Sequence, residues 1–193
     1  ETDVDDVKSS HIDPKVNDAF YKWCVDTYGQ IGEVKCIRGP KHDYLAMILD
    51  YSEKGKLKVD MRYYIRAMLE EFPTNFKNLK TTSAWNEKLF KTNNKSNKLD
   101  SKRKGTFHTF VMKAMFLCKR ARPDIAPGIV FLSGRVREPD ESDWKKLVKI
   151  LVFLHSTIED ILTLECDDIQ VLKWYLDAAF AVHFDMRSHT GGT

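Results

Sequence analysis

The chain has 193 residues, enough for one domain of ordinary size or two small lobes with a buried core. Its 42% hydrophobic and 31% charged residues exclude wholesale disorder, and a formal net charge of +3 does not by itself indicate a polyanion partner. Four cysteines far apart in sequence favour reduced intracellular thiols over a zinc site. The chain contains no apolar run of about 18 residues and no signal-peptide pattern, so neither membrane insertion nor secretion is expected.

The chain opens on the acidic run Asp3-Val4-Asp5-Asp6, followed by the polar segment Lys8-Ser9-Ser10. This pattern fits the tip of a β-hairpin that holds a carboxylate at its turn. It also fits a frayed acidic N-terminus, which is what a short acidic run usually is. The chain starts without methionine and ends on Thr190-Gly191-Gly192-Thr193, which predicts a segment of a longer polypeptide.

Helical and extended patterns alternate through the first 73 residues. Asp13-Pro14 is typical of a helix N-cap and first position, and this helix is expected to continue to Tyr28. Strands are expected at 32–37 and 44–51, and a loop containing Gly55 joins the second of them to a strand at 57–61. An amphipathic helix is expected over 61–72.

The second half predicts helices and then two strands. Residues 74–103 are polar and rich in Lys and Asn, which indicates a long extended connection, either a linker or a functional loop. Helices are expected at 107–119, at 125–136 and, capped by Asp140 or Ser142, at 144–154. Strands at 162–166 and 171–176 are expected to form a terminal hairpin. The predicted fold class is therefore α+β.

Four separated parts of the chain carry recognisable motifs: Val4-Asp5-Asp6; Tyr44-Leu45-Ala46-Met47; Ala121-Arg122-Pro123-Asp124-Ile125; and Tyr175-Leu176-Asp177-Ala178-Ala179-Phe180 with Asp185-Met186-Arg187-Ser188-His189-Thr190-Gly191. In order, they resemble the x-Asp-Asp turn, the Leu-Gly strand and primer grip, the Thr-Arg-Pro-Asp-Ile block and the Ser-Asp-Ala-Asp-Trp and Arg-Arg-Ser-Thr-Ser-Gly motifs of Copia-type LTR retrotransposon polyproteins. The matching segment runs from the end of the reverse transcriptase palm into ribonuclease H. Each motif is weak alone, but together they cover nearly the whole chain in the family's order.

The resemblance implies four segments. Residues 1–73 would be the palm end, the primer-grip hairpin and a thumb-like helix, and 74–106 an extended connection. Residues 107–160 would be a helical connection region, and 161–193 the truncated start of a ribonuclease H-like domain. The implied activity is RNA-directed DNA polymerase with ribonuclease H, which acts on a nucleotide and an RNA or DNA primer-template.

The resemblance also implies two metal sites. Asp5 and Asp6 would be catalytic ligands of Mg²⁺ (or Mn²⁺) in the palm, and Asp177 would be the first of four acidic ligands in ribonuclease H. The other ligands would lie outside this chain, so the segment alone is expected to be inactive. Without the resemblance, Asp177 is a surface residue at a strand end. No membrane partner is implied, and the expected location is intracellular: cytoplasm, virus-like particles or nucleus.

Five cations near the predicted hairpin and thumb-like helix are candidates for contacts with nucleic-acid phosphates: Lys54, Lys56, Lys58, Arg62 and Arg66. The alternative for any single lysine is a solvated surface. Lys119, Arg120 and Arg122 are weaker candidates, and Arg122 is also placed to pair with Asp124 or to cap a helix.

Three positions depart from the family's pattern: Asp3, where an aromatic residue is usual; Ala46, where the family has Gly; and His155-Ser156-Thr157, where it has Lys-Gly-Thr. They keep a second hypothesis open, that of a decayed or non-catalytic retroelement-derived module that binds nucleic acid or protein.

Overall fold

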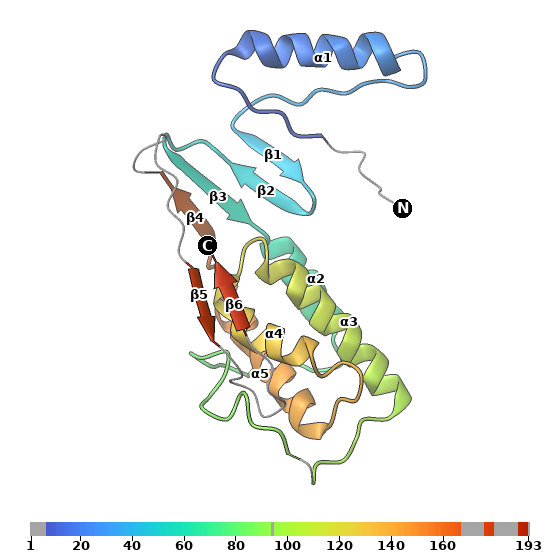
Figure 1. Cartoon of the computed structure of the whole chain (residues 1–193), viewed down its shortest axis with the longest axis vertical. Helices are drawn as coiled ribbons and strands as arrows, with labels where there is room; N and C mark the ends of the chain where they lie inside the picture. Colours follow the sequence, from blue (N-terminus) through green and yellow to red (C-terminus); the bar gives the residue numbers. More distant parts are fainter. Residues whose placement is uncertain (1–6, 94, 167–175, 180–188, 193) are drawn as a thin grey trace.

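The computed structural model describes residues 7–93, 95–166, 176–179 and 189–192 (Figure 1). That part of the chain contains five α-helices and a four-stranded antiparallel sheet, which confirms the predicted α+β class. The elements are α1 Pro14–Tyr28, β1 Lys41–Tyr44, β2 Met47–Asp50, β3 Lys56–Asp60, α2 Arg62–Glu71, α3 Ser101–Cys118, the 3-10 helix η1 Pro123–Ile125, α4 Ala126–Ser133, α5 Glu141–Ser156, β4 Leu162–Glu165, β5 Leu176–Ala179 and β6 His189–Gly192. None of the described helices is both long and apolar enough to span a membrane.

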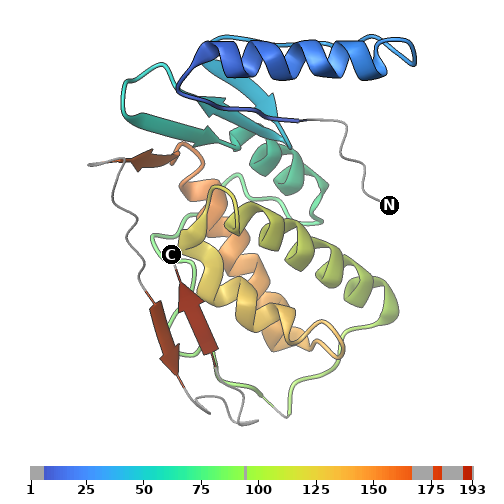
Figure 2. The ribbon, with the colours of Figure 1, turned by 45° about the horizontal axis from the view of Figure 1, so that its top comes forward.

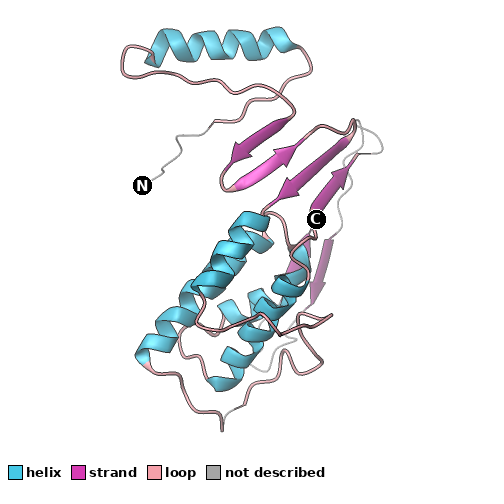
Figure 3. Ribbon diagram, turned by 180° about the vertical axis from the view of Figure 1, so that it is seen from behind, coloured by secondary structure: helices cyan, strands magenta, loops and turns pink. Residues whose placement is uncertain are grey.

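The main sheet has the strand order β1-β2-β3-β4, with every neighbouring pair antiparallel. Leu49 and Val59 lie opposite each other in the β2–β3 register, and both are buried. β3 leads directly into α2, so the sheet and the helices are continuous (Figure 3). In Figures 1 and 2, α1 lies on the far side of the sheet from α2–α5, and none of its residues is buried.

Two strand predictions in this region are wrong. The strand expected over 44–51 is a hairpin instead, because the chain reverses at Leu45 and Ala46. Their φ angles are 48° and 61°, the left-handed values that a tight two-residue hairpin turn requires. The turn was not predicted because it lies within a continuous run of apolar residues, which is typical of a strand. The strand expected over 32–37 does not form, since residues 33–38 have no regular structure.

The core lies between α2, α3, α4 and α5, with one face of the sheet against it. α5 is capped at Asp140, whose carboxylate accepts hydrogen bonds from Ser142 N at 2.7 Å and Asp143 N at 3.0 Å. Of its apolar residues, Leu147, Leu151 and Leu154 are fully buried, as predicted. α3 begins six residues before its predicted start because the Asp100 carboxylate accepts from Arg103 N at 2.9 Å.

The terminal hairpin expected from 162–166 and 171–176 lies partly outside the described residues. At its first strand the structure has β4 (Leu162–Glu165), which pairs with β3 and is an edge strand of the main sheet. Residues 171–175 lie outside the described part, and β5 pairs with β6 in a separate two-stranded sheet. The connection expected over 74–103 has little regular structure as far as residue 100, and α3 begins at Ser101. Its buried Phe76, Ala84 and Leu89 hold it against the helices.

Candidate nucleic-acid interface

Of the three predicted catalytic carboxylates, Asp177 alone lies in the described part of the chain. Asp5 and Asp6 lie outside the described residues. Asp177 is on β5, where its backbone lies opposite Gly191 of β6. Among the described residues, no three His, Cys, Asp or Glu side chains are grouped closely enough to hold a metal ion.

Two of the three predicted phosphate-binding lysines of the hairpin pair with one carboxylate. Lys56 Nζ lies 2.5 Å from Glu53 Oε1, and Lys58 Nζ lies 3.0 Å from Glu53 Oε2. Hydrogen bonds from Lys56 and, to a smaller extent, from Lys58 lower the pKa of the Glu53 carboxyl group. The hydrogen bond to Glu53 in turn raises the pKa of Lys56. The two lysines share one carboxylate, so their positive charge is partly offset.

The predicted arginines of α2 are paired in the same way. Arg62 Nη2 lies 2.8 Å from Asp60 Oδ2, and Arg62 Nη1 lies 2.6 Å from Glu159 Oε2. Arg66 Nη2 binds the other oxygen of Glu159 at 3.0 Å. The hydrogen bonds that Arg62 donates to Asp60 and, to a smaller extent, to Glu159 raise the pKa of Arg62. The hydrogen bond from Arg62 also lowers the pKa of Glu159. These pairs join the start of α2 to the segment after α5.

Arg122 is a structural residue. Its side chain is 3% exposed and makes hydrogen bonds to two partners. Nε and Nη2 donate to the Asp124 carboxylate at 2.7–3.2 Å, while Nη1 and Nη2 donate to the Thr157 carbonyl and hydroxyl at 3.0 and 2.6 Å. Because Thr157 is the C-cap residue of α5, Arg122 both pairs with Asp124 and caps a helix.

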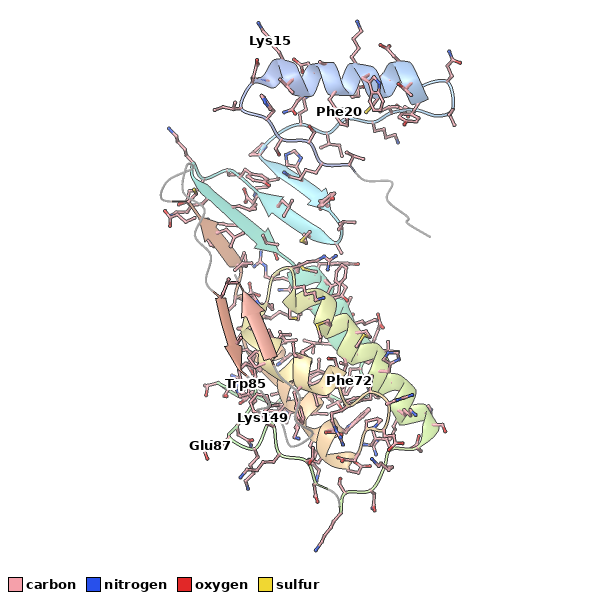
Figure 4. All side chains as sticks on the ribbon, viewed as in Figure 1. Lys15, Phe20, Phe72, Trp85, Glu87 and Lys149 are labelled. Atoms are coloured by element: carbon pink, nitrogen blue, oxygen red, sulfur yellow. The ribbon has the colours of Figure 1, made fainter. Side chains whose placement is uncertain are left out.

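A second basic region was missed by the sequence analysis. A groove of about 420 Å³ separates the segment 84–93 from the first turns of α5. It is lined by five lysines and by apolar and uncharged polar residues, with no carboxylate: Ala84, Trp85, Asn86, Lys88, Leu89, Lys91, Thr92, Asn93, Ser142, Lys145, Lys146 and Lys149. Figure 4 shows Trp85 and Lys149 close together in this part of the molecule, with Glu87 extending outward.

The sequence contained one signal for this groove. Residues 74–99 hold six lysines and a single acidic residue, Glu87, and Lys145 and Lys149 are one helical turn apart. What sequence could not supply was the contact between these two segments, which are separated by about fifty positions.

One comparison bears on the origin of the chain. A protein of Saccharomyces cerevisiae named "Putative transposon Ty5-1 protein" is 24% identical to it over 192 residues, which is 98% of this chain. This likeness supports a retrotransposon origin. The chain spans 59% of the length of that protein. A retrotransposon origin agrees with the order of motifs along the sequence. No family model and no solved structure matches the chain.

Proposed function

We propose that this chain is part of a retrotransposon reverse transcriptase–ribonuclease H polypeptide, and that its described region binds the primer-template. The observation that supports this proposal best is the likeness to a transposon protein over 98% of the chain. The four motifs stand within that span in the order they have in Copia-type polyproteins.

In this proposal the hairpin and α2 hold the primer-template backbone through Lys54, Lys56, Lys58, Arg62 and Arg66. Four of these five cations are bound to Glu53, Asp60 or Glu159. A phosphate must therefore displace a carboxylate before it can bind there. Exposed ion pairs contribute only about 0–1 kcal/mol, so such an exchange costs little. Lys54 forms no ion pair within the described residues.

Asp5 and Asp6 would hold Mg²⁺ (or Mn²⁺) at one site and Asp177 at another. Carboxylate oxygens are the donors that these hard cations prefer, so the residue types fit the metal. When bound, a pair of such ions neutralises charge on the phosphoryl group being transferred.

Duplex binding tests the nucleic-acid role. Fluorescence anisotropy of a labelled RNA–DNA duplex should show binding at low salt, with an affinity that falls steeply as salt is added. Arg62→Gln with Arg66→Gln should weaken it, because two phosphate contacts are lost. If the wild-type chain does not bind the duplex at low salt, the proposed role is wrong.

Calorimetric titration with Mg²⁺ tests the metal ligands separately from activity. Asp5→Asn and Asp177→Asn should each reduce binding, because an amide is a weaker ligand for Mg²⁺ than a carboxylate. Unchanged Mg²⁺ binding by Asp5→Asn would exclude Asp5 as the principal ligand of its site.

A second candidate is a non-catalytic, retroelement-derived binding module. The observation that favours it is Ala46, which has a φ of 61° at the turn where the family has glycine. The added Cβ crowds the part of the hairpin that would approach the primer. Duplex binding without Mg²⁺ binding would favour this candidate over the first.

A further inference from the structure

The lysine groove carries positive charge that the described part of the fold does not neutralise. Lys88, Lys91, Lys145 and Lys149 line it, and none of their ammonium groups forms an ion pair with a described residue. Ammonium groups on facing walls repel one another and raise the local positive potential. An anion that enters the groove gains from all four.

The wall formed by 84–93 is held in place rather than free to spread. Ala84 and Leu89 are 5% and 2% exposed, so the segment is anchored in the core. Lys146 Nζ, on α5, donates to the Lys91 carbonyl at 2.7 Å and so joins the two walls. Burial lowers the pKa of Lys146, whose Nζ also lies 4.6 Å from the Phe131 ring centroid. Lys146 is thus a positioning residue, and the other four lysines are available to a ligand.

Trp85 gives the groove an aromatic surface. Its indole packs beside Gly128 of α4, where a Cβ would lie 3.3 Å from Trp85 Cε3 and 2.7 Å from Ile150 Cδ1. The absent side chain lets α4 and α5 close on the tryptophan, which is half-buried and still lines the groove. A flat ring fixed beside several lysines is the combination that unpaired nucleotides recognise.

We propose that this groove is a binding site for single-stranded nucleic acid, in which the lysines contact backbone phosphates and Trp85 stacks on a base. Lysines act as point charges without the paired donors of arginine, so the site would bind strands with little sequence preference. Its volume is that of a small-molecule site, which suits one or two nucleotides of a flexible strand better than a duplex.

The site goes beyond the proposed function because it lies on other residues than the hairpin and α2 and takes an unpaired strand. It needs neither catalysis nor a metal. The two proposals can therefore fail separately: loss of duplex binding concerns the hairpin and α2, and loss of single-strand binding concerns the groove.

The test uses the 193-residue chain and a labelled oligothymidylate, with binding followed by fluorescence anisotropy over a range of salt concentrations. Lys88→Gln with Lys149→Gln removes one charge from each wall. The slope of log affinity against log salt should fall by about 1.4, since each phosphate contact of a single strand contributes about 0.7. Near 0.1 M salt, binding should weaken on the order of tenfold.

Lys15→Gln with Lys22→Gln is the matched control, because it removes the same net charge from exposed positions on α1, which lies on the far side of the sheet from α5. It should leave oligothymidylate binding within about twofold of the wild type. Trp85→Phe, which keeps an aromatic ring in the packing, should weaken binding less than the double lysine variant. Unchanged circular dichroism and thermal unfolding will show that the variants are folded.

Three results would overturn the proposal. The first is a groove variant that binds oligothymidylate as tightly as the wild type, and the second is a control variant that loses as much binding as the groove variant. The third is an outcome with vesicles of anionic phospholipid: if the groove variant loses vesicle binding while oligothymidylate binding is unchanged, the groove is a membrane-surface site.

Discussion

Lys56 and Lys58 of β3 lie 2.5 and 3.0 Å from the Glu53 carboxylate, whereas Lys88 and Lys149, on opposite walls of the groove, have no carboxylate partner among the described residues. Both regions are rich in cations. In the hairpin and α2, four of the five candidate cations bind carboxylates of the fold, and Arg62 and Arg66 join α2 to Glu159. In the groove they line a concave surface that contains no acidic side chain.

This difference shows that the number of lysines and arginines in a stretch of sequence does not measure the charge offered to a ligand. The resemblance to a primer grip and a thumb pointed to the cations of the hairpin and α2. Glu53 and Glu159 pair with cations there and offset part of their positive charge. The groove, whose walls come from segments far apart in sequence, presents more unpaired positive charge. The predictions below test this contrast, from the largest expected effect to the smallest.

Arg122 is the extreme case of a cation used by the fold, so Arg122→Ala should give the largest effect. The free energy of unfolding should fall by about 3 kcal/mol, because the Thr157 carbonyl loses its donor and Asp124 its partner. Asp124 is 41% exposed and regains water, which limits the loss. Arg122→Lys should lose somewhat less, since one ammonium cannot satisfy both partners.

Urea unfolding followed by circular dichroism measures these losses. Lys119→Ala is the control: Lys119 is exposed and stands three residues away, so its replacement should change the free energy of unfolding by less than about 0.5 kcal/mol. If Arg122→Ala costs no more than this control, Arg122 does not hold the fold.

Removing the competing carboxylates should leave the cations of the hairpin and α2 unpaired, like those of the groove. Glu53→Gln with Glu159→Gln leaves the cations of the hairpin and α2 in place and frees them for phosphates. Affinity for an RNA–DNA duplex should rise, roughly tenfold at low salt, and its salt dependence should become steeper. Oligothymidylate binding by the groove should rise much less. Anisotropy with the two labelled ligands measures both.

The control for this gain removes two exposed carboxylates elsewhere, with Glu33→Gln and Glu70→Gln. It reports how far the change in net charge alone raises affinity. Equal gains in the test and control variants would show that the cations near Glu53 and Glu159 do not contact the duplex.

The turn of the hairpin allows stability to be changed without changing charge. Ala46→Gly should raise the free energy of unfolding by about 1 kcal/mol, because a left-handed φ of 61° strains alanine and not glycine. The same substitution in α2, Ala67→Gly, should lower it by about 1 kcal/mol. Thermal and urea unfolding measure the opposite signs. Ala67→Gly should leave nucleic-acid binding unchanged, and a change in binding by that variant would show that affinity follows stability rather than charge.

Lowering the pH should weaken the ion pairs of the hairpin strands and α2 before it affects the groove, which is lined by no carboxylate among the described residues. Hydrogen bonds from Ser52, and then the pair with Lys41, lower the pKa of Asp50 to about 2. The stability that Asp50 contributes is therefore complete above the pKa of an unfolded aspartate, near 4, and is lost as pH falls from about 4 to about 2. Asp50→Asn should reduce this acid sensitivity slightly in urea titrations at several pH values. An unchanged pH dependence would contradict the assignment.

Local signals in the sequence predicted much of the fold. Asp13-Pro14 marked the start of α1 and Asp140 the start of α5, because caps act on neighbouring backbone groups. The spacing of Leu147, Leu151 and Leu154 predicted the buried face of α5. Two features of the fold were not predicted. The β3–β4 pairing joins strands about a hundred residues apart, and the turn at Leu45-Ala46 contains no glycine to mark it in the sequence.

For the candidate interface, too, the local features were predicted from the sequence and the non-local ones were not. The pairing of Arg122 with Asp124 was foreseen because the two residues are neighbours in sequence. The neutralisation of Arg62 and Arg66 by Glu159 was not foreseen, since the partner lies more than ninety residues away. The groove was missed for the same reason, because its two walls meet only in the folded chain.

One measurement compares both regions at once. Lysines of the 193-residue chain are acetylated briefly, with and without oligothymidylate, and the extent of modification at each site is determined by mass spectrometry. We predict that the oligonucleotide protects Lys88, Lys145 and Lys149, while Lys56 and Lys58 react slowly in its absence and no more slowly in its presence. Protection of Lys56 and Lys58, with the groove lysines as reactive as before, would contradict the account.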